Sequence, residues 1–229
     1  YSFWPKEWSL EAYRYMATQG QTIFRAYGIS ILTTFIGTIS GLMLTAMLGY
    51  TLSRNELPGR KIINFLVFFT LLFNGGMVPT YLLYVNTLHV KNTIFALLLP
   101  NNILVNGFNV LLVRTYFFSI IMPISKPILA TVGLLIGIGY WNDWYNGLLY
   151  LTNTKLFSLQ NYLNRILLDI QFMTQSMAGS AEAANALGKM PTITVRMAIA
   201  VIGILPLMII FPFFQSYFAR GMTVGAVKG

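Results

Sequence analysis

The chain has 229 residues, of which 56% are hydrophobic and only 9% are charged. A soluble domain usually carries about a quarter charged residues, so this composition excludes an ordinary soluble enzyme. The net charge of +9 comes from Lys and Arg scattered at the ends of apolar stretches, with no basic patch of interleaved aromatics, which argues against nucleic-acid binding.

Five long apolar stretches predict an all-α fold, a polytopic transmembrane helical bundle that forms one domain over 1–229. A helix needs about 20 apolar residues to cross the hydrocarbon core. Lipid offers the backbone no hydrogen-bond partners, so such stretches must be helices. The predicted spans cover residues 27–53, 62–84, 93–117, 124–150 and 194–218.

Residues 1–25 are amphipathic and rich in Trp and Tyr, and we interpret them as an interfacial segment. The first span then carries the small residues Gly37, Ser40, Gly41 and Gly49. Small residues let helix backbones approach closely, so these positions predict tight helix packing.

The run Asn74-Gly75-Gly76 and Pro79 interrupt the second span. Broken spans occur where the backbone is buried in protein or lines a cavity. The break is compatible with a plain kink and with a gating element, and Asn74 is a candidate for the substrate path.

Asn102, Asn106 and Asn109 recur in the third span at i, i+4 and i+7, a spacing that predicts one helix face. Polar side chains in a span face the bundle interior or a cavity. They could therefore form interhelical hydrogen bonds or line a polar translocation path.

Trp141, Asn142, Asp143 and Trp144 belong to the densest group of polar aromatics, near the end of the fourth span. Asp143 lies about 25 Å along a helix from Lys126, hence near the outer interface. The group could be an interfacial aromatic belt or an outward-facing surface that handles sugar.

Charge density sets the predicted orientation. The compact turn 54–61, the junction 114–126 and the tail 219–229 hold seven Lys or Arg against one acid, which predicts that they are cytoplasmic. The segment 1–25 and the long polar loop 151–193 then face outward.

No catalytic set is visible, because no Ser-His-Asp set, paired carboxylates or metal-ligand cluster falls within one plausible site. The stretch ending in Gly188-Lys189 is not a P-loop, since Ala183 and Met190 stand where that motif needs Gly and Ser or Thr. We therefore expect neither enzyme activity nor ATP binding in this chain.

The C-terminal sequence YFARGMTVGAVKG, residues 217–229, closely resembles the C-terminus of the maltose-type (carbohydrate uptake) ABC importer permeases. Further segments resemble the same family in the same order: FNGGMVP at 73–79, LLLP at 97–100, NVLLVRTYF at 109–117, WNDW at 141–144 and PT followed by VRMA at 191–198. The similarity runs nearly end to end and looks closest to the second permease of oligosaccharide importers.

This resemblance implies a type I ABC importer permease fold with six spans, in the bacterial cytoplasmic membrane. It implies a second permease, two ATP-binding-cassette ATPase subunits that hold ATP and Mg²⁺, and an extracytoplasmic solute-binding protein reached by the outer loop 151–190. The expected function is translocation of a sugar or oligosaccharide by alternating access, with no cofactor in this chain.

The family's cytoplasmic coupling loop reads Glu-Ala-Ala, three residues, Gly, nine residues, then Ile-x-Leu-Pro. Ile120-Ile121-Met122-Pro123 resembles its end, but Leu104 and Val110 stand where its acidic start and its Gly belong, so most of the loop is absent. The family's first span is also missing, and we expect the sequence to be part of a longer protein. The resemblance implies ATPase-subunit contacts at Ser119, Ile120, Met122, Pro123, Gly221, Thr223, Gly225 and Lys228.

Two other classes remain to be weighed: an ion-coupled secondary transporter and a membrane-embedded enzyme. A coupled carrier needs ionisable residues within the membrane, and only Asp143 qualifies. An enzyme needs a nucleophile or a metal set, and the sequence offers none.

Overall fold

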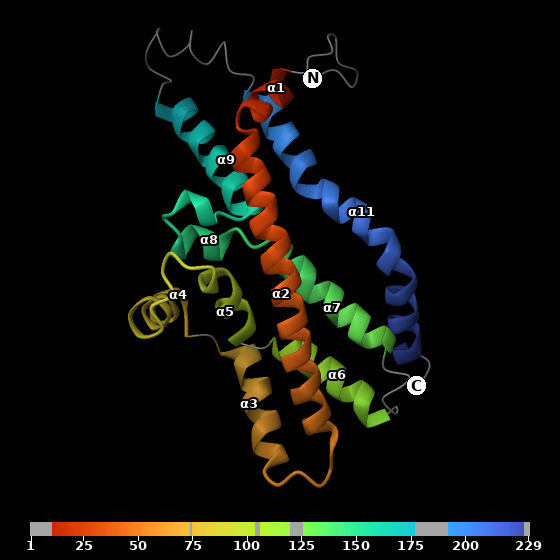
Figure 1. Cartoon of the computed structure of the whole chain (residues 1–229). Coiled ribbons are helices and arrows are strands. Elements are labelled where there is room, and N and C mark those ends of the chain that lie inside the picture. Colours follow the sequence, from red (N-terminus) through yellow and green to blue (C-terminus); the bar gives the residue numbers. More distant parts are fainter. Residues whose placement is uncertain (1–10, 74, 104–105, 120–125, 177–191, 227–229) are drawn as a thin grey trace.

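The computed structural model describes residues 11–73, 75–103, 106–119, 126–176 and 192–226, and Figure 1 shows their arrangement. Helices make up the regular structure of these residues. Their bounds are α1 Glu11–Thr18, α2 Gly20–Ser53, α3 Arg60–Leu72, α4 Met77–Leu82, the π-helix η1 Leu83–Thr87, α5 Phe95–Ile103, α6 Gly107–Ser119, α7 Lys126–Trp141, α8 Tyr145–Tyr150, the 3₁₀-helix η3 Thr154–Leu156, α9 Leu159–Ser176 and α11 Thr192–Ala226.

Helix α2 runs along the length of the bundle and packs mainly against α7 and α6 (Figure 1). Its buried face is a stripe of small residues with helical spacing. The stripe consists of Ala26, Ser30, Thr33, Gly37, Gly41, Thr45 and Gly49. The predicted close packing of the first span is confirmed for its three glycines, whereas Ser40 is only half-buried.

Two glycines of the stripe are close-approach positions. A Cβ atom at Gly37 would lie 2.4 Å from the Tyr140 ring, and one at Gly49 would lie 2.8 Å from the Val113 side chain. The Tyr140 hydroxyl donates to the Leu98 carbonyl at 2.8 Å, which fixes the ring against α2. The glycines therefore set how near α7 and α6 come to α2.

Helix α11 contains Pro206, which has no N–H to donate to the carbonyl of Ile202 four residues earlier. The Tyr27 hydroxyl of α2 donates to that carbonyl at 2.6 Å. The Trp141 indole N–H donates to the next carbonyl, that of Gly203, at 3.1 Å. Side chains from α2 and α7 thus hold α11 at its proline.

Among the residues that the structure describes, two helices are each long and apolar enough to cross a membrane, namely α2 and the Thr194–Phe213 part of α11. Helix α3 and the helical segment Met77–Thr87, which joins α4 and η1, would count as a third span only if they are taken together, and they are bent by 112° at the predicted break. A bend of that size is a sharp change of direction and not a plain kink. The first and fifth predicted spans therefore exist as single helices, and the second does not.

The prediction of one continuous helix over 93–117 is wrong, because α5 ends at Ile103 and α6 begins at Gly107. Asn106 is the residue that starts α6, since its side-chain oxygen accepts the Phe108 N–H at 3.0 Å. The three asparagines do not share one helix face as predicted, because the break separates Asn102 on α5 from Asn106 and Asn109.

The predicted fourth span is likewise divided. Helix α7 ends at Trp141 and α8 begins at Tyr145. Between them, the Asp143 carboxylate accepts the backbone N–H of Asn146 at 3.1 Å. Asp and Asn favour such turns over helix interiors, so the polar run ends the helix instead of continuing it.

The predicted loop 151–193 is wrong over its first half, where the structure has η3 and α9. Ser158 precedes α9 and is a favoured N-cap residue. Leu159 and Leu163 begin its buried apolar face. The Leu159 N–H donates to the Ser30 hydroxyl oxygen of α2 at 2.7 Å. An amphipathic helix of this kind lacks the long apolar run on which the span prediction depended.

The termini differ from the prediction in extent. Helix α2 begins at Gly20 instead of residue 27, and α1 precedes it, with Met16 buried in the same core cluster as Ile23. At the other end α11 continues to Ala226, so the predicted tail 219–229 is helical up to that residue.

The three regions predicted to be cytoplasmic from their charge begin or end in the same part of the bundle. Figure 1 shows the α2–α3 turn, the end of α6 and the end of α11 in the lower part of the bundle, with α1 and the start of α11 at the opposite end. The assignment of the lower end to the cytoplasm stays a prediction.

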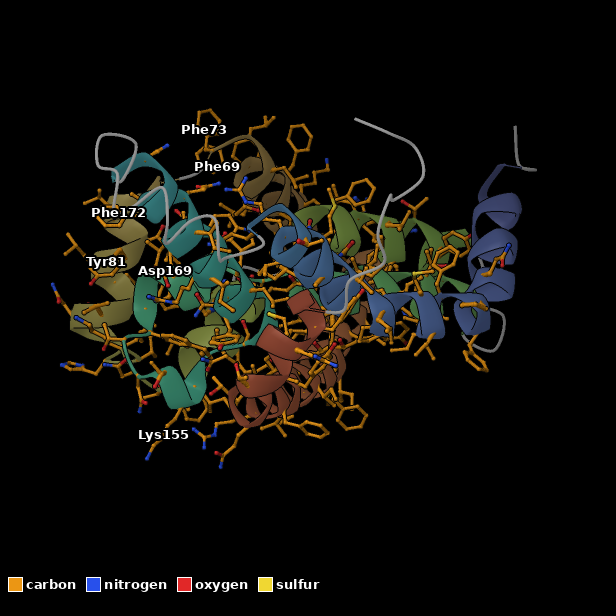
Figure 2. All side chains as sticks on the ribbon, turned by 90° about the horizontal axis from the view of Figure 1, so that it is seen from above. Phe69, Phe73, Tyr81, Lys155, Asp169 and Phe172 are labelled. Carbon is orange, nitrogen blue, oxygen red and sulfur yellow. The ribbon has the colours of Figure 1, made fainter. Side chains whose placement is uncertain are left out.

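The outer surface is strongly apolar. Phe69 of α3 and Phe73, the residue after α3, stack at 4.3 Å between ring centroids, and both are exposed. Figure 2 shows these rings and Phe172 of α9 projecting from the outside of the molecule. A surface of this kind suits lipid or another apolar subunit and not water.

Candidate functional site

The helix breaks open onto two cavities that carry polar side chains. The first, the α3–α6 cavity, has a volume of about 730 Å³ and is lined by α2, α3, α4, α5 and α6. The second, the α9–α11 cavity, has a volume of about 460 Å³ and lies between α9, α11 and the α7–α8 connection. Both volumes fall within the range of about 300–1,000 Å³ typical of small-molecule sites.

The polar side chains of the α3–α6 cavity carry three hydroxyls and two amides, those of Thr70, Thr80, Tyr84, Asn101 and Asn106. Asn106 was predicted for the substrate path and lies here, although it also caps α6. Sequence reasoning missed Asn101, which stands next to Asn102 and follows Pro100 directly. Hydroxyls and amides can both donate and accept hydrogen bonds.

Asp143 is the centre of a polar cluster that ties α5 to α8. The Asn101 and Asn146 amides each donate to its Oδ2 atom at 2.7 Å. The Asp143 backbone carbonyl accepts the Ser158 hydroxyl at 3.1 Å, which adds the start of α9. Because Asn101 lines the α3–α6 cavity and the residues flanking Asp143 line the other, the cluster lies between the two cavities.

The α9–α11 cavity combines amides, an indole and a guanidinium in one wall. Its polar lining consists of Asn142, Trp144, Gln160, Asn164 and Arg196. The Arg196 Nε atom is buried and has no hydrogen-bond partner among the described residues. The sequence analysis does not identify Gln160, Asn164 and Arg196 as cavity residues. Gln160 and Asn164 lie on α9, where a loop is predicted.

A third cavity, apolar and about 400 Å³ in volume, continues the α9–α11 cavity along α7 and α11. The two share Ile204 and Leu207 as wall residues. The polar mouth thus leads into an apolar groove beside the proline region of α11.

The remaining predicted path residues lie elsewhere. Trp141 is 4% exposed, and its indole is bonded to α11, so it belongs to the helix packing and lines no cavity wall given above. Asn109 is buried on α6 at 5% exposure. Asn74 lies outside the described residues, as does the side chain of Asn102.

The predicted ATPase contacts are described only in part. Ser119 is the last residue of α6, and Gly221, Thr223 and Gly225 lie in the final turns of α11. The described residues do not include Ile120, Met122, Pro123 and Lys228. Figure 1 shows the ends of α6 and α11 in the lower part of the bundle.

The α2–α3 turn at the same end is basic and held by hydrogen bonds. Arg54 donates to the Tyr50 hydroxyl, which raises the pKa of its guanidinium. Arg60 donates to the Leu52 carbonyl at 2.9 Å. The turn therefore stays positively charged at any physiological pH, as the predicted cytoplasmic location requires.

Comparison with known proteins identifies the relatives of the chain. No protein-family model matches it. It is 32% identical to the polygalacturonan/rhamnogalacturonan transport system permease protein YtcP of Bacillus subtilis, over 98% of this chain and 84% of the relative. It is also 32% identical to LplC of the same organism, over 98% and 81%. With the arabinooligosaccharides transport system permease protein AraQ of B. subtilis it shares 27% identity, over 98% and 81%.

A solved structure has the same fold. It is the crystal structure of a bacterial ABC transporter involved in the import of the acidic polysaccharide alginate. The TM-score is 0.69 at 29% identity, over 86% of this chain and 75% of that chain. The resemblance stated from the sequence is thereby confirmed.

The alignment with YtcP is 247 residues long, more than the 229 residues of this chain. The relative therefore has residues within the aligned region that this chain lacks. The relatives are permeases of ABC transport systems. This relationship rejects the two other classes that were weighed, an ion-coupled secondary transporter and a membrane-embedded enzyme. The chain belongs to the family of carbohydrate ABC importer permeases, and it is a multi-pass membrane protein that serves as a transport subunit and not as an enzyme.

Proposed function

We propose that this chain forms part of the route by which a bacterial importer moves a saccharide across the cytoplasmic membrane. Its proposed partners are a second permease, two ATPase subunits that hold ATP and Mg²⁺, and an extracytoplasmic solute-binding protein. The observation that carries the proposal is the Asp143 cluster between two cavities lined by amides and hydroxyls, within an otherwise apolar bundle.

The chemistry of this arrangement suits a sugar in transit. Amide and hydroxyl groups can exchange hydrogen bonds with sugar hydroxyls without holding them tightly, and the largely apolar walls limit affinity. Transport requires binding that differs between two conformations and not strong binding in one. Asp143 reaches α5, α8 and α9, so a shift of these helices would change both cavities together.

The cytoplasmic and outer ends take different partners in this proposal. The lower end, with Ser119, the segment 120–123 and the tail 219–229, contacts the ATPase subunits. YtcP has residues inside the alignment that this chain lacks, which agrees with the expected absence of most of the coupling loop. The segment that includes α9 faces the solute-binding protein.

The central test uses the whole importer reconstituted in proteoliposomes with its binding protein. Asp143→Ala removes the acceptor of the Asn101 and Asn146 amides, and we expect ATP-dependent saccharide uptake to fall about tenfold or more, because hydrogen bonds to charged groups contribute about 1.5–3 kcal/mol. Gln21→Ala, at an exposed position of α2, is the matched control and should leave uptake unchanged.

Three results would count against the proposal. Unchanged uptake in Asp143→Ala would remove the cluster from the route. Uptake driven by an ion gradient without ATPase subunits would overturn the importer mechanism. Deletion of 221–229 should weaken ATPase assembly, and unchanged saccharide-stimulated ATPase activity would remove the tail from that contact.

A further inference from the structure

The α9–α11 cavity contains a cation, Arg196, that has no acidic neighbour among the described lining residues. Arg196 lies in its wall beside the amides of Asn142, Gln160 and Asn164, and no Asp or Glu of the described residues lines it. An arginine side chain remains protonated at every physiological pH. The described lining of the cavity is therefore positively charged, although its other polar groups are neutral.

The contrast with Arg165 on α9 shows what an engaged arginine looks like in this fold. Arg165 donates to the Asn161 side chain at 3.2 Å and to the Leu151 carbonyl at 3.0 Å, and it lies over the Phe157 ring at 4.3 Å. Arg196 has no such set of partners given by the structure, and its buried Nε atom has no hydrogen-bond acceptor among the described residues. A buried donor of a charged group is costly to leave unpaired, so this arrangement favours a ligand that brings an acceptor.

The other side chains indicate the kind of molecule that carries this acceptor. Three amides can hydrogen-bond hydroxyl groups on either side of an anion. Trp144 is 42% exposed at the cavity and offers an aromatic face to the C–H side of a sugar ring. The guanidinium fork matches a carboxylate through two parallel hydrogen bonds.

We infer that the α9–α11 cavity is a subsite for the carboxylate group of an acidic saccharide, that is, a sugar with uronic acid units. Arg196 binds the carboxylate, Asn142, Gln160 and Asn164 bind neighbouring hydroxyls, and Trp144 packs against the ring. This inference rests on the proposed function and narrows its substrate to a chemical class.

The test measures ATP-dependent uptake of trigalacturonate by the complete importer in proteoliposomes. Arg196→Gln keeps a polar side chain but removes the charge, and we expect at least a tenfold lower uptake rate at subsaturating concentration, which corresponds to about 1.4 kcal/mol. Arg196→Lys keeps the charge without the fork and should lose less. Arg25→Gln removes an exposed arginine of α2 and should transport like the wild type.

Each other outcome has a defined meaning. Undiminished uptake in Arg196→Gln overturns the subsite. A loss of uptake that parallels a lower melting temperature of the complex shows that Arg196 is a packing residue, and it overturns the subsite too. A defect seen only in liposomes with phosphatidylglycerol, and not in phosphatidylcholine alone, assigns Arg196 to a lipid headgroup and overturns it as well. A wild-type importer that moves neutral saccharides but not trigalacturonate refutes the substrate class alone, whereas no ATP-dependent saccharide uptake at all refutes the proposed function.

Discussion

The hydrogen bond from Tyr27 to α11 allows a quantitative prediction about the proline region. Its oxygen atoms are 2.6 Å apart and partly buried, and the Ile202 carbonyl cannot accept from Pro206. Side-chain hydrogen bonds between membrane helices contribute about 0.6 kcal/mol on average and up to about 1.7. An acceptor left unpaired costs about 1–3 kcal/mol. We therefore expect Tyr27→Phe to lower the free energy of unfolding by about 1–2 kcal/mol.

The explanation is tested by a double-mutant cycle with Pro206→Ala. Alanine supplies an N–H that can bond to the Ile202 carbonyl within the helix, so Tyr27→Phe should then cost less than about 0.5 kcal/mol. The assay is unfolding of the purified permease in mixed micelles by titration with dodecyl sulfate, followed by tryptophan fluorescence. Tyr145→Phe, at an exposed ring, is the control. Additive effects of the two substitutions would refute the reasoning that Tyr27 compensates for the proline.

Three further predictions concern packing, orientation and a loop. Gly37→Ala should lower the unfolding free energy by about 1–3 kcal/mol, because the added Cβ atom clashes with the Tyr140 ring. Gly28→Ala should be neutral or stabilising, because a Cβ atom there has no neighbour within 4 Å. Equal effects of the two substitutions would contradict the packing argument. The chain has no cysteine, so single cysteines can be introduced and labelled one at a time. With the predicted orientation, a membrane-impermeant maleimide should label Arg14→Cys in intact cells and Asn55→Cys only in inverted vesicles. The reverse pattern would show that the predicted orientation is wrong. Asn92 has a positive φ of 57°, and its side-chain oxygen accepts two backbone N–H groups of the α8–η3 connection at 2.7 and 3.0 Å. Because glycine tolerates a positive φ and alanine does not, Asn92→Ala should lower the melting temperature more than Asn92→Gly. The opposite order would contradict the conformational role of Asn92.

The long apolar helices could be predicted from the sequence because lipid imposes a length and a composition on any helix that crosses it. Helices α2 and α11 satisfy both conditions. The resemblance of the chain to the carbohydrate ABC importer permeases was confirmed as well. The glycines of the α2 stripe were also predictable, since small residues at helical spacing have few other uses in a span.

The breaks could not be predicted from hydropathy, because they depend on which polar side chains cap a new helix. Asn106 and Asp143 both read as polar residues within apolar stretches, yet each accepts a backbone N–H and starts a turn or helix. The signal that could have revealed α9 was present: Ser158 as a cap, followed by apolar residues at 159, 163, 166, 167 and 170. A loop prediction for this segment gives no helix face, so it could not identify Gln160 and Asn164 as cavity residues.

The bond between Ser30 and the first residue of α9 bears on how the protein is made. The two residues are 129 positions apart, and the Leu159 N–H has its acceptor on a helix synthesised long before it. An isolated peptide of α9 would begin with this donor exposed to water and would lose a buried contact that fixes its first turn. During synthesis α2 precedes α9, so the Ser30 hydroxyl is already present as an acceptor when the Leu159 N–H emerges.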